Sequence, residues 1–232
     1  MNKVILVTGA AKRIGKQIAK EFFAIDFNII VHFNSSSEDA ISLCNELNAI
    51  RPNSAVSIQA NLDHMNDVKN LASQAMSAFG RIDGLINNAS TFYPTPMGEF
   101  SEKDWDALMG SNLKAPLFLI QELHEELKKQ SGFVINVTDI NIKRPIKNHS
   151  IYLAAKSGLD TLTKSLAKDL APEIRVNAIA PGAILEPPNK TWTDAEKNNI
   201  LSAVPLKKWA PKLILLKPQY FLLNLNTLQV KL

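Results

Sequence analysis

The strongest constraint on this chain is a regular alternation of short apolar runs with longer amphipathic segments. Five longer segments show the apolar spacing of helices, near residues 14–25, 38–49, 65–79, 102–129 and 150–170. Six shorter runs have the length and composition of β-strands: Val4–Val7, Asn28–Phe33, Ala55–Gln59, Gly84–Asn87, Phe133–Val137 and Arg175–Ile179. Strands that alternate with helices are typical of a parallel sheet covered on both faces. The sequence therefore predicts an α/β fold with a Rossmann-like, doubly wound parallel sheet.

Length and composition favour one globular domain followed by an unusual tail. With 232 residues, 46% hydrophobic and 21% charged, the chain can form a substantial core, which excludes a wholly disordered protein. We predict a single domain over residues 1–210, because no linker divides it. Residues 211–232 contain no Gly, Asp or Glu. We expect these residues to form an atypical C-terminal tail.

Charge and cysteine content exclude several classes of protein. The net charge of +4 arises near the C-terminus, because all 22 acidic residues lie at or before Glu196 and six lysines follow. The basic isoelectric point is therefore weak support for nucleic-acid binding. Cys44 is the only cysteine, and the four histidines make no metal-binding pattern. No apolar run approaches the roughly 18 residues of a membrane span. We expect a cytoplasmic protein with no metal, no membrane association and no nucleic-acid partner.

A glycine-containing turn follows the first predicted strand and opens the first predicted helix. It reads Thr8-Gly9-Ala10-Ala11-Lys12-Arg13-Ile14-Gly15. Glycines at such a place let the backbone approach a pyrophosphate, and the helix N-terminus supplies N–H donors and a positive dipole. A purely structural turn is the alternative. The strand–turn–helix context favours a dinucleotide site at Gly9, Arg13, Ile14 and Gly15.

The end of the second predicted strand lacks the acid that often binds a ribose 2′-hydroxyl in dinucleotide sites. The region reads His32-Phe33-Asn34-Ser35-Ser36-Ser37, and the first acid is Glu38. Hydroxyl groups with Lys12 and Arg13 nearby suit a 2′-phosphate, which a carboxylate would repel. The alternative is a polar strand end that caps the next helix, with Ser37 as the N-cap.

Tyr152 and Lys156 lie four residues apart and so share one face of a predicted helix. An ammonium group stabilises a phenolate, so we expect Lys156 to lower the pKa of Tyr152 and to make it a proton donor near neutral pH. Asp139 lies 13 residues upstream, after the strand Phe133–Val137, and we expect it beside this pair. The alternatives are a surface Tyr–Lys pair and a turn or capping role for Asp139.

Together these motifs resemble those of the short-chain dehydrogenase/reductase family. The resemblance covers residues 3–209 and rests on motifs in the expected order: Thr8-Gly9…Gly15, Asn87-Asn88-Ala89-Ser90, Asn112, Tyr152…Lys156 and Pro181-Gly182. Within that family the sequence is similar to the pteridine reductases. This narrower likeness rests on Arg13 in the glycine turn, the strand end His32-Phe33, the run Ser90-Thr91-Phe92-Tyr93-Pro94-Thr95-Pro96, and Asp139 where most relatives have serine.

The resemblance implies that NADPH binds along the carboxyl edge of the sheet. The implied cofactor residues are Gly9, Arg13, Ile14, Gly15, His32, Phe33, Asn34, Ser35, Asn61, Leu62, Asn88, Ala89, Ser90, Lys156, Pro181 and Gly182. Lys156 is expected to hold the nicotinamide ribose, and Asn112 to support a water relay behind Lys156. Two positions depart from the family pattern. Ser35 replaces a basic residue, and Asn61 replaces an aspartate that accepts from the adenine amino group, a role its amide oxygen can also fill.

The narrower likeness implies a small-molecule pterin substrate. The reaction is reduction of a C=N bond in a dihydropterin or a related pteridine or folate. The implied substrate residues are Ser90, Phe92, Asp139 and Tyr152. Phe92 is expected to stack on the pterin ring, and an ordinary core aromatic is the alternative. We interpret Asp139 and Tyr152 as one coupled acid unit, with Lys156 and Asn112 as the other catalytic residues.

Two other functions stay open. The first is NADPH-dependent reduction of a carbonyl substrate such as a 3-oxoacyl thioester, against which Asp139 and the run from Phe92 argue. The second is a non-catalytic cofactor-binding protein with an altered C-terminus. Relatives continue beyond Trp209 through a further helix and strand that residues 211–232 do not match, as after a reading-frame slip or a replaced terminus. The family implies a homotetramer, and we expect this tail to remove the usual contact.

Overall fold

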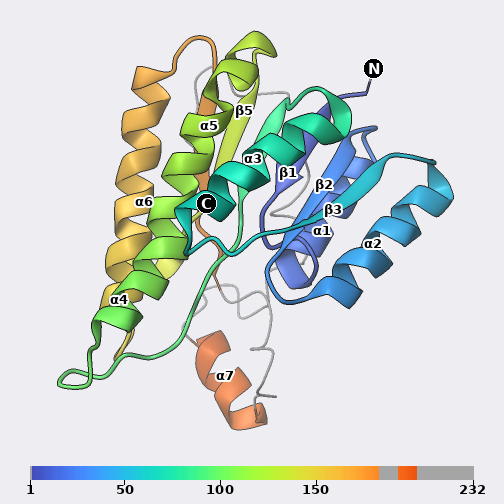
Figure 1. Ribbon diagram of the computed structural model, residues 1–232. Helices are drawn as coiled ribbons and strands as arrows, with labels where there is room; N and C mark the ends of the chain where they lie inside the picture. The colour runs from blue at the N-terminus through green and yellow to red at the C-terminus, as the bar shows by residue number, and fades with distance from the viewer. Residues whose placement is uncertain (1, 183–192, 203–232) are drawn as a thin grey trace.

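The computed structural model describes residues 2–182 and 193–202. Its centre is a parallel sheet of six strands in the order β3-β2-β1-β4-β5-β6 (Figure 1). The strands are β1 (Val4–Val7), β2 (Asn28–Phe33), β3 (Ala55–Gln59), β4 (Gly84–Asn87), β5 (Phe133–Val137) and β6 (Arg175–Ile179). Their bounds coincide with those of the six predicted runs. In the central pairs, Val4 lies beside Asn28, and Ile5 lies beside Gly84.

Helices cover both faces of this sheet (Figure 1). The α-helices of the described residues are α1 (Arg13–Phe23), α2 (Ser37–Ile50), α3 (Met65–Phe79), α4 (Glu102–Met109), α5 (Ala115–Lys129), α6 (Ser150–Asp169) and α7 (Asp194–Ser202), and α7 lies apart from the sheet (Figure 1). The buried side chains of α1 and α2 pack against one face, whereas those of α3 and α5, with part of α6, pack against the other. This is the Rossmann-like, doubly wound α/β fold that the sequence predicted.

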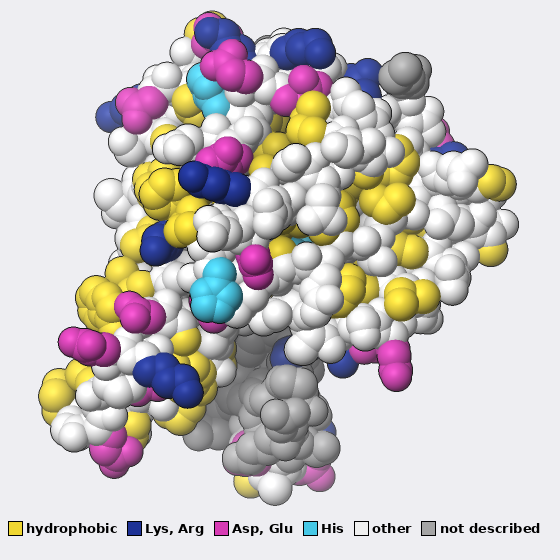
Figure 2. All heavy atoms as spheres, in the orientation of Figure 1, with side chains coloured by type: hydrophobic (Ala, Val, Ile, Leu, Met, Phe, Trp, Pro, Cys, Tyr) yellow, Lys and Arg dark blue, Asp and Glu magenta, His cyan; other side chains and the backbone are white. Residues whose placement is uncertain are grey.

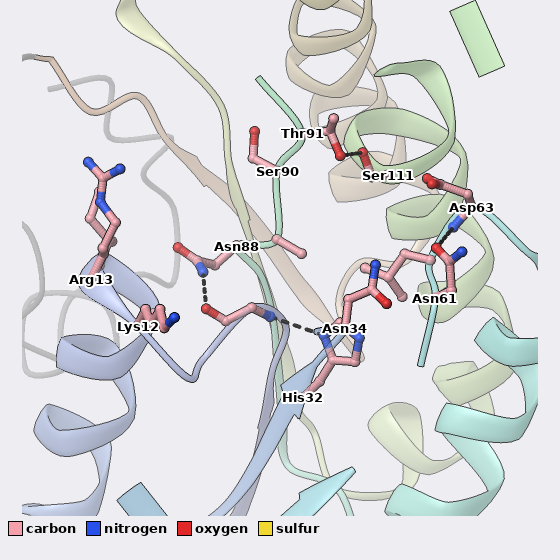
Figure 3. A pocket seen from close by; sticks show the side chains of 15 residues that line it. Lys12, Arg13, His32, Asn34, Asn61, Asp63, Asn88, Ser90, Thr91 and Ser111 are labelled. Carbon is pink, nitrogen blue, oxygen red and sulfur yellow. Dashed lines mark hydrogen bonds between the residues drawn. The ribbon is translucent and has the colours of Figure 1, made fainter. Parts of the chain in front are cut away.

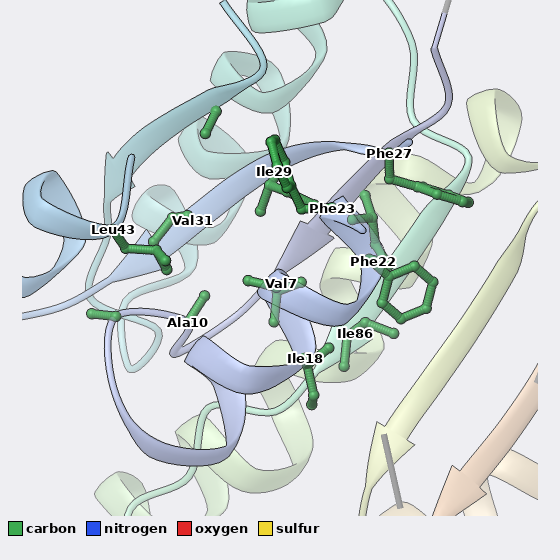
Figure 4. Packing of buried hydrophobic residues seen from close by; sticks show 14 of the residues in the cluster. Val7, Ala10, Ile18, Phe22, Phe23, Phe27, Ile29, Val31, Leu43 and Ile86 are labelled. Carbon is green, nitrogen blue, oxygen red and sulfur yellow. The ribbon is translucent and has the colours of Figure 1, made fainter. Parts of the chain in front are cut away.

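The two faces of the sheet hold two separate cores, because successive side chains of a strand point to opposite faces. Ile5 and Val7 of β1 join the core beneath α1 and α2 (Figure 4). Val4 and Leu6 join the core beneath α3 and α5. A strand buried on both faces is apolar at most of its positions, which explains the nearly continuous apolar runs. After β3 the chain crosses to the other face of the sheet, and β4 pairs with the free side of β1. This reversal of the strand order between β1 and β4 places a crevice at the carboxyl ends of the strands.

The helix predicted over residues 102–129 is not continuous. A π-helical turn, Gly110–Lys114, separates α4 from α5. Within it, Asn112 Nδ2 donates to the carbonyl oxygen of Leu108, four residues earlier, at 2.9 Å. Pro116 lies in the first turn of α5, where its missing N–H costs no helical hydrogen bond. Such turns are frequent at functional sites, and this one carries a predicted catalytic residue.

Two helix starts differ from the expectations. Helix α2 begins at Ser37, so the cap position is Ser36 rather than Ser37, and it makes no side-chain capping bond. Glu38 and Asp39 complement the helix dipole there instead. Helix α7 was not among the predicted helices, although Thr193 and Glu196 form a capping box, with Thr193 N donating to Glu196 Oε2 at 2.9 Å. The predicted tail, residues 211–232, lies outside the described residues.

Candidate active site

A cavity of about 390 Å³ lies at the carboxyl edge of the sheet (Figure 3). Its lining follows β1, β2, β3 and β4, since the carboxyl ends of parallel strands meet at one edge. The predicted cofactor residues in this lining are Gly9, Arg13, Ile14, Gly15, His32, Asn34, Asn61, Leu62, Asn88, Ala89 and Ser90. Lys12 and Thr91, which belong to the two motif runs, also line the cavity, together with two residues that the motifs did not single out, Asp63 and Ser111.

The glycine turn is packed so closely that Gly15 cannot carry a side chain. A Cβ there would stand 2.2 Å from the carbonyl oxygen of Gly9 and 2.6 Å from Asn88 Nδ2. Gly9 itself has a φ of +62°, in the left-handed region that favours glycine. Thr8 Oγ1 accepts from the backbone N–H groups of Asn88 and Ala89, each at 2.9 Å. The turn is thereby fixed at the N-terminus of α1, a geometry that suits a pyrophosphate.

Lys12 and Arg13 bring positive charge to this cavity. Arg13 has a φ of +53°, although it is not a glycine. Lys12 Nζ lies 2.9 Å from Asp39 Oδ2 on α2. Asn34 lines the cavity at the end of β2, whereas Ser35 is exposed beyond it. The close-packed turn, the two cations and this polar strand end together fit a dinucleotide that carries phosphate groups.

Asn61 uses its amide within the turn that follows β3. Its Oδ1 accepts from the backbone N–H of Asp63 at 3.1 Å. Its own backbone N–H donates to Asp67 Oδ2 at 3.1 Å. A carbonyl oxygen has two lone pairs, so the predicted acceptance from an adenine amino group depends on the second one.

The fold brings a phenol, a carboxyl group and an ammonium group together. Tyr152 Oη donates to Asp139 Oδ2 at 2.7 Å. Lys156 Nζ donates to the carbonyl oxygen of Val137 at 2.8 Å and lies 5.9 Å from the centroid of the Tyr152 ring. Asp139 lies two residues after the end of β5, and α6 places Tyr152 and Lys156 one turn apart. Tyr152 and Lys156 are buried, with 5% and 2% of their surface exposed.

The expectation that Lys156 lowers the pKa of Tyr152 is wrong. Burial raises the pKa of Tyr152, and the negative charge of Asp139 and the hydrogen bond to it raise that pKa further. Burial also lowers the pKa of Lys156 from 10.5 to about 8, an effect that Asp139 opposes. The physical reason is that desolvation disfavours both charged forms, which spacing along a helix does not reveal. Tyr152 therefore holds its proton firmly.

Asn112 fixes the segment that follows β4. Ser90 Oγ donates to Asn112 Oδ1 at 2.7 Å, and Asn112 Nδ2 donates to the carbonyl oxygen of Thr91 at 2.8 Å. Ser111 Oγ adds a hydrogen bond to Thr91 Oγ1 at 2.8 Å. The π-helical turn thus holds Ser90 at the edge of the cavity. The predicted water relay behind Lys156 stays a prediction.

Phe92 is not a core aromatic, because 54% of its surface is exposed. Its ring centroid lies 4.8 Å from that of Tyr152, edge to face, and 4.6 Å from that of His149, in a stacked arrangement. His149 was not predicted; its position three residues before Tyr152, at the N-cap of α6, was the available signal. Met97 and Trp105 are also exposed, and Figure 2 shows hydrophobic side chains gathered in this region, at the lower left.

Other predicted cofactor residues lie outside the lining of the cavity. The Phe33 side chain is 8% exposed and packs in the core beneath α1 and α2. Lys156 is buried, with its Nζ 5.9 Å from the centroid of the Tyr152 ring. Pro181 and Gly182 follow β6, and the Pro181 carbonyl oxygen accepts from the backbone N–H of Ile140 at 3.2 Å. This hydrogen bond places them beside the turn that carries Asp139.

None of the helices in residues 2–182 and 193–202 combines the length and the apolar character needed to cross a membrane. Over the same described ranges, no group of three or more His, Cys, Asp or Glu residues is arranged to hold a metal ion.

A doubly wound sheet, a close-packed glycine turn at its crevice and a Tyr–Lys pair nearby define a dinucleotide-dependent oxidoreductase. Sequence comparison agrees, because the model of the family described as short chain dehydrogenase matches residues 3–197. This chain belongs to the short-chain dehydrogenase family, whose members bind nicotinamide cofactors.

Similar proteins carry two different names. The chain is 34% identical over 211 residues to the 3-oxoacyl-(acyl-carrier-protein) reductase of Staphylococcus epidermidis, which covers 90% of this chain and 86% of that protein. It is also 34% identical over 232 residues to pteridine reductase 1 of Leishmania tarentolae, covering 83% of this chain and 80% of that protein. The corresponding reductase of Staphylococcus aureus is 33% identical, covering 90% and 85%. Overall identity therefore assigns the family and leaves two substrate classes.

Proposed function

We propose that this chain uses NADPH to reduce the C=N bond of a dihydropterin or a related pteridine or folate. The observation that carries the proposal is the 2.7 Å hydrogen bond from Tyr152 Oη to Asp139 Oδ2. A ketone reductase needs a hydroxyl here to orient a carbonyl group, whereas this chain presents a carboxyl group. A carboxylate accepts hydrogen bonds from an amino-pyrimidine edge, which a pterin offers and a 3-oxoacyl group lacks.

The cofactor would be held by the turn after β1 and by the strand ends. NADPH, when bound, supplies the hydride that the substrate carbon receives. Backbone N–H groups between Gly9 and Gly15 would bind its pyrophosphate, and Lys12 and Arg13 would bind its 2′-phosphate. Lys156 Nζ has three donors, of which Val137 takes one, so two are available for the nicotinamide ribose.

Tyr152 and Asp139 would supply the proton that the substrate nitrogen receives. Reduction of a C=N bond places hydride on carbon and a proton on nitrogen. Burial raises the pKa of Tyr152, so the phenol keeps its proton until negative charge develops on the ring nitrogen. Because Asp139 Oδ2 accepts the hydrogen bond from that phenol, the carboxyl group would orient the proton that Tyr152 transfers.

Phe92 would bind the flat substrate ring. Its exposed ring lies beside Tyr152, so a heterocycle stacked on it has its nitrogen near the phenol. Asn112 supports this arrangement, because its hydrogen bonds to Ser90 and Thr91 fix the segment that leads into Phe92.

Reduction of a 3-oxoacyl thioester is the second candidate, favoured by the 34% identity to the reductase of Staphylococcus epidermidis. A non-catalytic cofactor-binding protein is the third. We would follow NADPH oxidation with dihydropterin, 7,8-dihydrofolate and an acetoacetyl thioester in parallel. Oxidation with the pteridines supports the proposal, oxidation with the thioester alone supports the second candidate, and cofactor binding without turnover supports the third.

A matched pair of variants tests the substrate assignment. Phe92→Ala should raise the KM for dihydropterin about tenfold or more, because stacking on a ring contributes roughly 1–3 kcal/mol per base in comparable sites. Phe100→Ala is the control, since Phe100 is also exposed and lies on the same segment. Equal KM values in the two variants would contradict a stacking role for Phe92.

A further inference from the structure

His32 occupies a special place in the wall of the cavity. It lies on β2 and is 1% exposed, yet it lines the cavity next to the glycine turn. Its Nδ1 accepts from the backbone N–H of Gly9 at 3.0 Å (Figure 3). Its Nε2 lies 3.1 Å from the carbonyl oxygen of Ala60, just beyond β3. Both ring nitrogens are therefore engaged by backbone.

These two partners fix the tautomer of the ring. A backbone N–H can only donate, so Nδ1 must be the unprotonated acceptor, and a carbonyl oxygen can only accept, so Nε2 must carry the proton. An imidazolium would lose the bond from Gly9, because both of its nitrogens are donors. Burial lowers the pKa of His32 to about 4, which keeps the ring neutral over the working range of most enzymes.

The ring thereby joins three segments that the sequence separates. The His32 carbonyl oxygen accepts from the backbone N–H of Ala10 at 2.9 Å, so side chain and backbone hold adjacent residues of the same turn. The Ala60 backbone N–H in turn donates to the carbonyl oxygen of Phe33 at 3.0 Å. Gly9, with its positive φ, is the residue whose N–H direction this network fixes.

We propose that His32 is a positioning residue for the cofactor turn: its Nδ1 holds the Gly9 N–H so that the remaining N–H groups of the turn face the dinucleotide. The inference rests on the proposed dinucleotide function and refines the expectation that His32 contacts the cofactor. No ring nitrogen is left for a direct hydrogen bond to the cofactor. A histidine that merely filled the core would affect stability and leave the turn unchanged.

Two substitutions separate these roles. In His32→Asn, the amide Oδ1 takes the place of Nδ1 and keeps the acceptor for Gly9 while losing the bond to Ala60. In His32→Gln, the amide Nε2 takes the place of the ring Nε2 and keeps the bond to Ala60 while losing the acceptor for Gly9. Each variant loses one hydrogen bond, so we expect similar decreases in Tm.

The two variants should differ in cofactor binding. We expect His32→Gln to raise the Kd for NADPH at least about tenfold, the factor that 1.4 kcal/mol represents. The Kd of His32→Asn should stay within about threefold of the wild type. For a pteridine substrate, the loss in His32→Gln should fall on the KM for NADPH and not on kcat. Equal Kd values for NADPH in the two variants would overturn the inference. Kd values that rise in proportion to the decrease in Tm of each variant would also overturn it.

Two measurements without cofactor test the geometry directly. The side-chain ¹⁵N resonances of His32 in the wild type should show a protonated Nε2 and an unprotonated Nδ1 from pH 8 to pH 5. Hydrogen exchange at the Gly9 amide should be slow in wild type and His32→Asn and fast in His32→Gln. A protonated Nδ1, or equal exchange in both variants, would overturn the inference. If the wild type binds no NADPH, the proposed function fails, and these two measurements still decide the role of His32.

Discussion

Asp139 is held on both sides, because Oδ2 accepts from Tyr152 Oη at 2.7 Å while Oδ1 accepts from the backbone N–H of Asn141 at 2.7 Å. The backbone bond caps a short 3₁₀ turn, Ile140–Ile142, and fixes the direction of the carboxyl group. The capping role and the catalytic position, which the sequence left as alternatives, are thus filled by the same side chain. Oδ1 fixes the orientation of the carboxyl group, and Oδ2 accepts the hydrogen bond from the phenol.

Replacing the carboxyl group tests the acid unit. Asp139→Asn should lower kcat for dihydropterin by about 10² or more, the usual contribution of a positioned acid or base. The Kd for NADPH should change little, since Asp139 does not line the cofactor cavity. Stopped-flow turnover and fluorescence titration measure the two quantities.

The serine variant is the companion measurement for the same position. Asp139→Ser replaces the carboxyl group by the hydroxyl expected of a ketone reductase, so it should lose pteridine turnover and gain activity toward an acetoacetyl thioester. Full retention of pteridine turnover in Asp139→Ser would contradict the assignment of Asp139 and Tyr152 as one acid unit.

Lys156 gives a pH dependence of stability whose sign follows from burial. The pKa of Lys156 falls to about 8 in the folded protein from 10.5, so between these values the unfolded chain binds more protons. The cost of the buried charge is fully present below pH 8 and disappears as the pH rises towards 10.5. In urea titrations, the stability of the wild type relative to Lys156→Met should therefore rise by up to about 3 kcal/mol from pH 7 to pH 10.

The exposed Lys128 supplies the control for alkaline pH. The stability of the wild type relative to Lys128→Met should stay nearly constant over the same range, because that ammonium remains solvated. Parallel curves for wild type and Lys156→Met would show that the Lys156 ammonium is not buried at a cost.

Gly15→Ala should both destabilise the protein and abolish NADPH binding. The new Cβ would lie 2.2 Å from the Gly9 carbonyl oxygen, so the turn must move, at a cost of about 1–3 kcal/mol. Gly80→Ala is the matched control. Gly80 has a φ of +69° and no atom near its Cβ position, so it should lose about 1 kcal/mol and keep the Kd for NADPH. Urea unfolding and fluorescence titration measure both effects, and NADPH binding by Gly15→Ala would contradict the prediction.

We predict that the ion pair between Lys12 and Asp39 limits the affinity for the proposed 2′-phosphate. Asp39→Asn frees Lys12, so the Kd for NADPH should fall about two- to fivefold while the Kd for NADH stays constant. Glu46→Gln is the control, because Glu46 pairs with Lys20 on the same helix pair and does not line the cavity. An equal change for NADPH and NADH would show that Lys12 does not meet the 2′-phosphate.

The local sequence predicted those parts of the site that depend on near neighbours. The run Thr8–Gly15 predicts the turn after β1, because glycines and a following helix act within a few residues. The spacing of Tyr152 and Lys156 predicts a shared helix face for the same reason. The π-helical turn at Asn112 was not predictable from helical spacing, since it depends on hydrogen bonds to Ser90 and Thr91, some 20 residues away.

The sequence by itself determined the six strands, their bounds and the parallel doubly wound sheet, because a strand buried on both faces is apolar at most of its positions. Only the tertiary structure decided how the site residues behave. Burial reversed the expected pKa shift of Tyr152, and it left the ring of His32 with partners 23 and 28 residues away. Desolvation and long-range hydrogen bonds depend on which segments the fold brings together, and a linear pattern does not contain that information.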